Sequence, residues 1–181
     1  MNNPWKQKNS KVVYENPWLS VREDAVVRPD GSDGIYGVVS MKVSGGYIVA
    51  LNEDGQVPLV KLFRYPTQDA TWEFPSGGVD KNDPEAGVKT ELVEETGFAA
   101  NRWVRIGGFY SMAGVGDEFV HVFLARELSD VGNDKQSNEG ITEVHWVNFE
   151  DVAVMIRNGE FLDGPSIAAY FLAKDYLQNE A

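Results

Sequence analysis

Three glutamates, Glu91, Glu94 and Glu95, lie close together in the stretch ELVEETGF. In a helix, residues at i, i+3 and i+4 lie on one face, so these carboxylates would lie side by side. Like charges at this spacing repel each other by roughly 0.2–0.5 kcal/mol per pair. Gly97 is typical of the residue just past a helix C-terminus, where the helix dipole disfavours anions by about 0.3–1 kcal/mol each. Stability alone would favour Lys or Arg here, which indicates a chemical role for the carboxylates.

A divalent cation would explain this cluster. Mg²⁺ takes oxygen ligands and usually leaves positions for water and for a substrate phosphate. Its charge would remove the repulsion between the glutamates and offset the unfavourable helix dipole. It would also attract a phosphate substrate to a chain that has 28 acidic and 16 basic residues and a net charge of −12. The alternative interpretation is a solvated acidic helix face without a ligand.

The composition limits the classes of partner. A net charge of −12 repels polyanions, so we expect no binding to nucleic acid or to an anionic membrane. The chain has no cysteine, which excludes disulfides and thiolate metal sites. The N-terminus MNNPWKQKNSK is not a signal peptide, and no apolar run approaches the roughly 18 residues of a membrane span. We therefore expect a cytoplasmic protein with one domain, or one domain and a small appendage, in its 181 residues.

Strand-like segments precede most of the helical ones. Short strands are predicted over residues 11–50, and TWEFPSGGVDKNDP is predicted as a strand followed by a Pro/Gly-rich loop. Asp83 and Pro84 predict a helix start, with Asp83 as the N-cap, and this helix should end near Thr96. Two further helices are predicted at 150–159 and 165–178. This order favours an α+β sandwich over a parallel βαβ fold.

The segment around the glutamates resembles the Nudix box. That pattern is Gly, five residues, Glu, seven residues, then Arg-Glu-aliphatic-x-Glu-Glu-x-Gly-aliphatic. The matching residues are Gly77 at the first glycine, then Glu91, Leu92, Glu94, Glu95 and Gly97 in register, with Phe98 at the last apolar position. Flanking segments, including LVKLFRYPTQDATWEFPSGG and FYSMAGVGDEFVHVFLARELS, are similar to ADP-ribose pyrophosphatases of the Nudix family. The resemblance covers roughly residues 12–178.

The sequence departs from the box at several positions. The box arginine falls on Thr90 and the first glutamate on Asn82, and the loop from Gly77 to Asn82 is one residue short. In the family the arginine helps to hold the carboxylates in place, which Thr90 cannot do. Ala113 stands where ADP-ribose pyrophosphatases usually carry a proline. The metal-binding half of the box is intact, whereas its supporting half is not.

The resemblance implies a fold and an assembly. It implies an α+β fold, namely a Nudix-type α/β/α sandwich with a mixed sheet and an N-terminal antiparallel strand extension. Residues 1–44 would form the N-terminal strand region and take part in a homodimer. Residues 45–181 would form the hydrolase domain.

The resemblance also implies an activity and its residues. The expected reaction is metal-dependent hydrolysis of a nucleoside diphosphate linked to another moiety, with ADP-ribose or a nucleotide sugar as the expected substrate. Mg²⁺, or Mn²⁺ as an alternative, would bind Glu91, Glu94 and Glu95, which are also expected to be catalytic. Glu139 is expected to be the loop acid that takes the proton of the attacking water. The residues expected to bind substrate are Arg64, Glu73, Gly77 and Glu118.

Two other functions are compatible with the same sequence. Thr90 and Asn82 favour a Nudix-fold binding or regulatory protein with little turnover. A pyrophosphatase of free nucleotides is the other alternative. The long N-terminal strand region argues against it, because the smaller free-nucleotide hydrolases often lack such a region.

Overall fold

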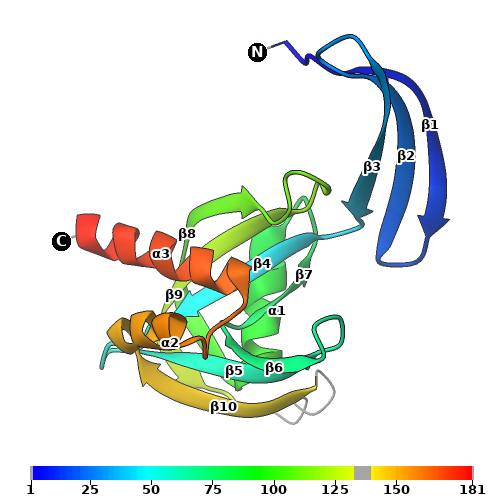
Figure 1. Cartoon of the computed structure of the whole chain (residues 1–181). Coiled ribbons are helices and arrows are strands. Elements are labelled where there is room, and N and C mark those ends of the chain that lie inside the picture. The colour runs from blue at the N-terminus through cyan, green and yellow to red at the C-terminus, as the bar shows by residue number, and fades with distance from the viewer. Residues whose placement is uncertain (1, 133–139, 181) are drawn as a thin grey trace.

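The computed structural model describes residues 2–132 and 140–180. The strands are β1 (Lys6–Glu15), β2 (Leu19–Val27), β3 (Asp33–Met41), β4 (Ser44–Ala50), β5 (Gln56–Arg64), β6 (Asp69–Glu73), β7 (Ser76–Val79), β8 (Phe98–Tyr110), β9 (Phe119–Asp130) and β10 (Ile141–Asn148). The helices are α1 (Pro84–Thr96), α2 (Val152–Asn158) and α3 (Gly164–Asn179), and the short 3₁₀ helix η2 (Phe149–Asp151) precedes α2. Figure 1 shows how these elements are arranged. No helix in the described part of the chain is long and apolar enough to cross a membrane.

Residues at both ends of helix α1 fix where the helix begins and where it ends. The Asp83 side chain accepts a hydrogen bond from the Ala86 N–H at 3.2 Å, and Pro84 occupies the first turn. Gly97 adopts the left-handed conformation, with φ of 80°, and its N–H donates to the Val93 carbonyl. These caps place the three glutamates in the second half of the helix, as predicted.

Two sheets form the body of the molecule. One has the strand order β7-β4-β9-β8, with β4 and β9 parallel and the other pairs antiparallel. The other is antiparallel, with the order β10-β5-β6. The turn at 51–55 therefore carries the chain from one sheet to the other. The segment predicted as a loop after β6 contains the strand β7, whose backbone pairs with β4.

Alternate residues of β4 and β9 pack against helices on opposite faces of the four-stranded sheet. On one face, Ile48 and Phe123 pack with Val88 and Leu92 of α1. On the other face the buried cluster includes Val49, Val122, Leu124, Val57, Leu59, Phe74, Phe161, Ala169, Tyr170 and Ala173. Burial of apolar side chains on both faces is the main force that holds such layers together. The predicted α+β sandwich with a mixed sheet is confirmed.

The first three strands form a separate antiparallel sheet of order β1-β2-β3. Figure 1 shows this sheet standing to one side of the two-sheet body. Its β3 edge is joined to the segment after β8, because the Val39 N–H donates to the Val115 carbonyl at 2.8 Å and the Asp117 N–H donates to the Val39 carbonyl at 3.1 Å. The predicted N-terminal strand extension is thus confirmed, whereas a domain boundary at residue 44 stays a prediction.

Candidate active site

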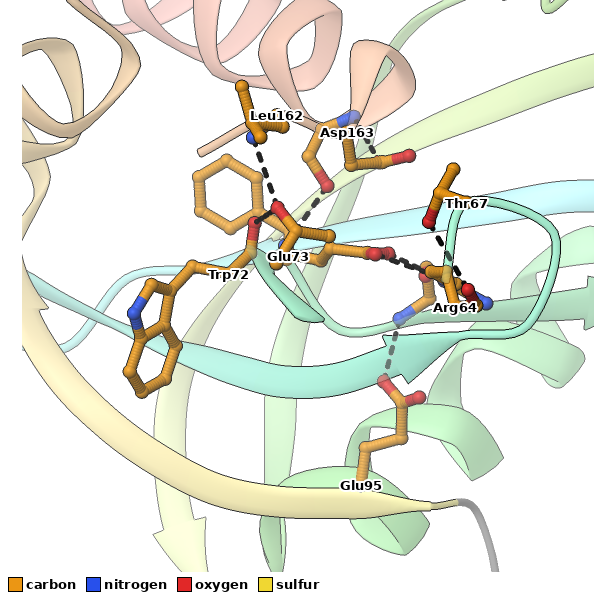
Figure 2. Close-up of polar contacts among 11 residues, drawn as sticks. Arg64, Thr67, Trp72, Glu73, Glu95, Leu162 and Asp163 are labelled. Carbon is orange, nitrogen blue, oxygen red and sulfur yellow. Dashed lines mark hydrogen bonds and ion pairs between the residues drawn. The ribbon is translucent and has the colours of Figure 1, made fainter. Parts of the chain in front are cut away.

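Two of the helix glutamates meet the backbone of β7. The Ser76 N–H donates a hydrogen bond to Glu95 Oε2 at 2.7 Å (Figure 2). Glu95 is only 5% exposed. The Glu91 carboxylate lies directly against Gly77, where a Cβ atom would be 2.2 Å from Glu91 Cδ. Glu94 belongs to the same turn of α1 and is half-buried. The last turns of α1 therefore present carboxylates to residues 76–77.

An ion pair on the neighbouring sheet lies close to these carboxylates. Arg64 donates to Glu73 twice, from Nε to Oε1 at 2.9 Å and from Nη2 to Oε2 at 2.5 Å. The two residues end β5 and β6, and Glu73 is fully buried. The Glu73 carboxylate raises the pKa of Arg64, which stays charged. Figure 2 shows this pair between Glu95 and Asp163.

A first cavity adjoins residues 76–78. It has a volume of about 290 Å³ and is lined in part by Arg64, Gly77 and Glu118. Glu118 is held there by Ser111, whose Oγ donates to Glu118 Oε2 at 2.6 Å. The N-terminal sheet and its connection to β4 reach the same cavity, because Trp18 and Met41 also line it. The cavity therefore depends on both parts of the chain.

A second cavity lies on the other side of the ion pair. Its volume is about 370 Å³, and Arg64 and Glu73 line it. The remaining polar side chains of its wall are Thr67, Asp69, Thr71 and Asp163. Arg64 lines both cavities, so a ligand bound to its guanidinium can extend into either one.

Comparison with known proteins identifies the family of the chain that contains this site. A model described as the NUDIX domain matches residues 41–170, which is most of the chain. The chain belongs to the Nudix family. A second model, described as the nucleoside diphosphate sugar hydrolase N-terminal domain, matches residues 5–39 and so covers the three-stranded sheet.

Individual relatives of this Nudix chain agree with that assignment. It is 36% identical over 135 residues to an ADP-ribose pyrophosphatase of Bacillus subtilis, which covers 72% of this chain and 73% of the relative. It is 28% identical over 167 residues to an ADP-ribose pyrophosphatase of Mycobacterium tuberculosis, covering 88% and 78% of the two chains. A crystal structure of an ADP compounds hydrolase matches the fold with a TM-score of 0.86 at 16% identity, over 98% of this chain and 96% of the other.

Members of the Nudix family generally use a divalent metal, and the carboxylates fit one by their chemistry. Glu91 and Glu95 offer oxygen donors, and both approach residues 76–77. Within residues 2–132 and 140–180, no three His, Asp or Glu side chains are gathered as a ready metal cage. The carboxylates that approach residues 76–77 suit Mg²⁺, which is usually bound through one or two carboxylates together with substrate phosphates.

The structure gathers several of the predicted residues from distant parts of the sequence. Arg64, Gly77 and Glu118 share the first cavity, and Glu73 binds Arg64. Glu139 lies outside the described residues. The functional assignments of all the predicted site residues stay predictions.

Most residues that line the two cavities were not predicted as site residues, and Met41, Tyr47 and Asp163 are examples. Nothing in their local sequence distinguishes them, because only the packing of sheets and helices brings them to the site. Burial raises the pKa of the Tyr47 phenol, so this side chain stays neutral beside the Arg64 and Glu73 pair.

The two box departures lie on the surface of α1 and its preceding loop. Thr90 is exposed, and its Oγ donates to the Ala86 carbonyl at 3.3 Å, one turn back on its own helix. Asn82 is exposed as well, in the loop between β7 and α1.

Proposed function

We propose that this Nudix protein hydrolyses a nucleoside diphosphate linked to another moiety, ADP-ribose or a nucleotide sugar, with the help of Mg²⁺ or Mn²⁺. The observation that carries the proposal is the approach of Glu91 and Glu95 to residues 76–77, next to the cavity that contains Arg64. Carboxylates beside residues 76–77 and a guanidinium in the adjoining cavity suit a substrate with a metal-bound diphosphate. The matched N-terminal model supports a diphosphate-linked sugar over a free nucleotide.

Each group of residues at the site has a different proposed role. Glu91, Glu94 and Glu95 would hold the metal, which when bound supplies positive charge to the phosphate oxygens. Arg64 would donate hydrogen bonds to the diphosphate, since Glu73 uses only its Nε and Nη2 atoms. Gly77 leaves room for the Glu91 carboxylate, and Glu118, which also lines the first cavity, would contact the substrate.

The bond changes follow from the products. A water oxygen attacks one phosphorus of the diphosphate, and the bond from that phosphorus to the bridging oxygen breaks. The proposed base, Glu139, takes the proton of the water. A nucleoside monophosphate and a sugar phosphate result, which for ADP-ribose are AMP and ribose 5-phosphate. Charge develops on the phosphate oxygens in the transition state, where hydrogen bonds from Arg64 would stabilise it.

We propose in addition that the protein is a homodimer formed through its N-terminal sheet. Every residue of β1 is exposed in the single chain, and Val12, Val13 and Tyr14 are among the exposed apolar side chains. The outer edge of β1 has no strand partner within the described residues. Open strand edges with apolar side chains are usually covered in native proteins, and a second copy would cover this one.

A substrate screen tests the hydrolase proposal. ADP-ribose, several nucleotide sugars and nucleoside triphosphates are incubated with the protein and Mg²⁺, and phosphate products are followed. Mass spectrometry after reaction in ¹⁸O-water identifies the phosphorus attacked, because only one product phosphate carries the label. Cleavage of triphosphates alone would contradict the substrate class. Binding of ADP-ribose without cleavage of any compound would favour the binding-protein alternative, for which the exposed Thr90 and Asn82 are the structural argument.

A further inference from the structure

The second cavity lies beyond Arg64 and has no role in the reaction described above. We infer that it binds the group attached to the distal phosphate, and that it selects an uncharged, hydroxyl-rich sugar over an anionic one. This inference rests on the proposed function, because it places the diphosphate at Arg64. The volume of about 370 Å³ lies near the lower end of the range of roughly 300–1,000 Å³ that is usual for small-ligand sites.

Arg64 links the two cavities into one elongated site. Glu73 occupies the Nε and Nη2 atoms of its guanidinium, whereas Nη1 has no hydrogen-bond partner among the described residues. A diphosphate bound to Nη1 therefore has one cavity on each side. The first cavity, with Trp18 and Gly77, lies toward the helix glutamates, and the second lies toward the start of α3. Figure 2 shows Glu95 and Asp163 on opposite sides of the Arg64–Glu73 pair.

The wall of the second cavity suits sugar hydroxyls. Two carboxylates, Asp69 and Asp163, line it, and two hydroxyls, Thr67 and Thr71, accompany them. Carboxylates accept hydrogen bonds from hydroxyl groups, and threonine hydroxyls can both donate and accept. An apolar group would gain little binding free energy from this wall. It would displace water from polar atoms without replacing the hydrogen bonds of that water.

The same wall has a charge that disfavours anions. Three carboxylates line the cavity, namely Asp69, Asp163 and Glu73, against the single cation Arg64. Arg64 is already paired with Glu73, so Asp69 and Asp163 determine the charge that a distal group would meet. A sugar acid or a sugar phosphate would lie beside two like charges, whereas a neutral sugar would not.

The polar side chains are held in place by the backbone. Asp163 Oδ2 accepts from the Ser166 N–H at 2.8 Å, which caps α3. Thr71 Oγ accepts from the Leu162 N–H at 3.0 Å, and this bond ties the loop before α3 to β6. Thr67 Oγ donates to the Arg64 carbonyl at 3.2 Å within the β5–β6 turn. These contacts join β6, the hairpin turn and the start of α3 into one fixed wall.

The test uses pairs of compounds that differ only in one anionic group on the sugar. Suitable pairs are UDP-glucose with UDP-glucuronate, GDP-mannose with GDP-mannuronate, and ADP-ribose with its terminal phosphate ester. For each pair, kcat/KM is measured for the unmodified protein and for Asp69→Asn, Asp163→Asn and the double variant. Asn can still cap α3, so Asp163→Asn should fold. Asp54→Asn, in the exposed turn 51–55 away from both cavities, is the matched control.

The unmodified protein should prefer the neutral member of a cleaved pair by roughly tenfold or more, since two like charges lie nearby. The double variant should lose most of this preference, while Asp54→Asn keeps it. Hydrolysis with a preference that the variants do not change would overturn this inference and leave the proposed function standing. If a pair is bound but not cleaved, the same ratio is taken from dissociation constants. If no pair is cleaved or bound, the inference and the proposed function are both overturned.

Discussion

The carboxylate of Glu91 occupies the space that a side chain on residue 77 would need. A Cβ atom built on Gly77 would be 2.2 Å from Glu91 Cδ and 2.3 Å from Glu91 Oε1. Gly77 therefore allows α1 to approach β7 closely enough for the Glu91 carboxylate to lie against residue 77, which lines the first cavity. Its importance is steric, because the missing side chain leaves room for the functional one.

Gly77→Ala should displace the Glu91 carboxylate and lower any metal-dependent activity at least tenfold, because positions of ligands and reacting groups are sensitive to shifts of about 1 Å. The fold should survive, since the end of a flexible side chain can move aside. Turnover and the melting temperature are the measurements. Gly37→Ala in β3 is the control, because a Cβ there meets nothing within 4 Å. Equal turnover in both variants would show that the position of Glu91 does not matter.

Glu91→Gln and Glu95→Gln should each weaken Mg²⁺ binding and turnover together, by at least tenfold, since a neutral amide is a poorer ligand for a hard cation. Without metal, stability should stay the same or rise slightly because the repulsion between helix glutamates is reduced. Calorimetric titration with Mg²⁺ measures the affinity. Glu85→Gln on the exposed first turn of α1, where Glu85 pairs with Lys89, is the control. Unchanged Mg²⁺ affinity in both variants would exclude this metal site.

Thr90→Arg should raise metal-dependent turnover, more so when combined with Asn82→Glu. A guanidinium can hold a carboxylate through two donors, which the Thr90 hydroxyl cannot do from its bond to the Ala86 carbonyl. Thr90 is exposed, so the larger side chain fits without repacking. Thr90→Lys supplies the positive charge without the paired donors of a guanidinium and should raise kcat less. A kcat that stays constant or falls in all of these variants would mean that the site compensates for Thr90 in another way.

Arg64→Ala should destabilise the protein by about 3 kcal/mol at neutral pH, because it leaves the buried Glu73 carboxylate without its partner. Lys61→Ala removes the partner of Glu143 in a half-exposed ion pair and should cost less than about 1 kcal/mol. Urea denaturation of both variants measures the difference.

The loss of unfolding free energy caused by Arg64→Ala should also depend on pH. Burial raises the pKa of Glu73, and loss of the guanidinium raises this pKa further. The folded state then holds the Glu73 proton more tightly than the unfolded state does. The loss of stability should be smallest at low pH, where Glu73 is protonated in both folded proteins. It should grow as the pH rises through the raised Glu73 pKa of the unmodified protein toward the still higher pKa of the variant. A loss of stability that is constant from pH 4 to pH 8 would contradict a buried, paired Glu73 carboxylate.

Charges on β1 should dissociate the proposed dimer. The double variant Val12→Lys, Val13→Lys places two charges among the exposed apolar side chains of this strand. Sedimentation velocity should show a dimer for the unmodified protein and a monomer for the variant. Val131→Lys with Val154→Lys, two exposed valines outside the N-terminal sheet, should stay dimeric. A monomeric unmodified protein would refute the proposed assembly directly.

Local features allowed part of the structure to be predicted. The caps of α1 depend on Asp83, Pro84 and Gly97, whose preferences act within one or two turns of the backbone. The strand segments and the late helices follow from hydrophobic pattern and turn residues, which also act locally. The strand β7 was missed because two of its four residues are glycines, which are typical of loops, and only its pairing with β4 makes it a strand.

The sequence by itself determined that the glutamates share one helix face near a glycine-rich segment, because helix geometry sets that spacing. Tertiary structure decided which backbone atoms those carboxylates meet, through the packing of α1 on β7. It also decided that Arg64 binds Glu73 and lies between two cavities. The β5–β6 register pairs Arg64 with Asp69 and Glu73 with Val60, so the two side chains meet along the hairpin and not across it, while the start of α3 closes the far side. Such contacts join distant segments, and their partners are set by burial of the whole core, which no local pattern encodes.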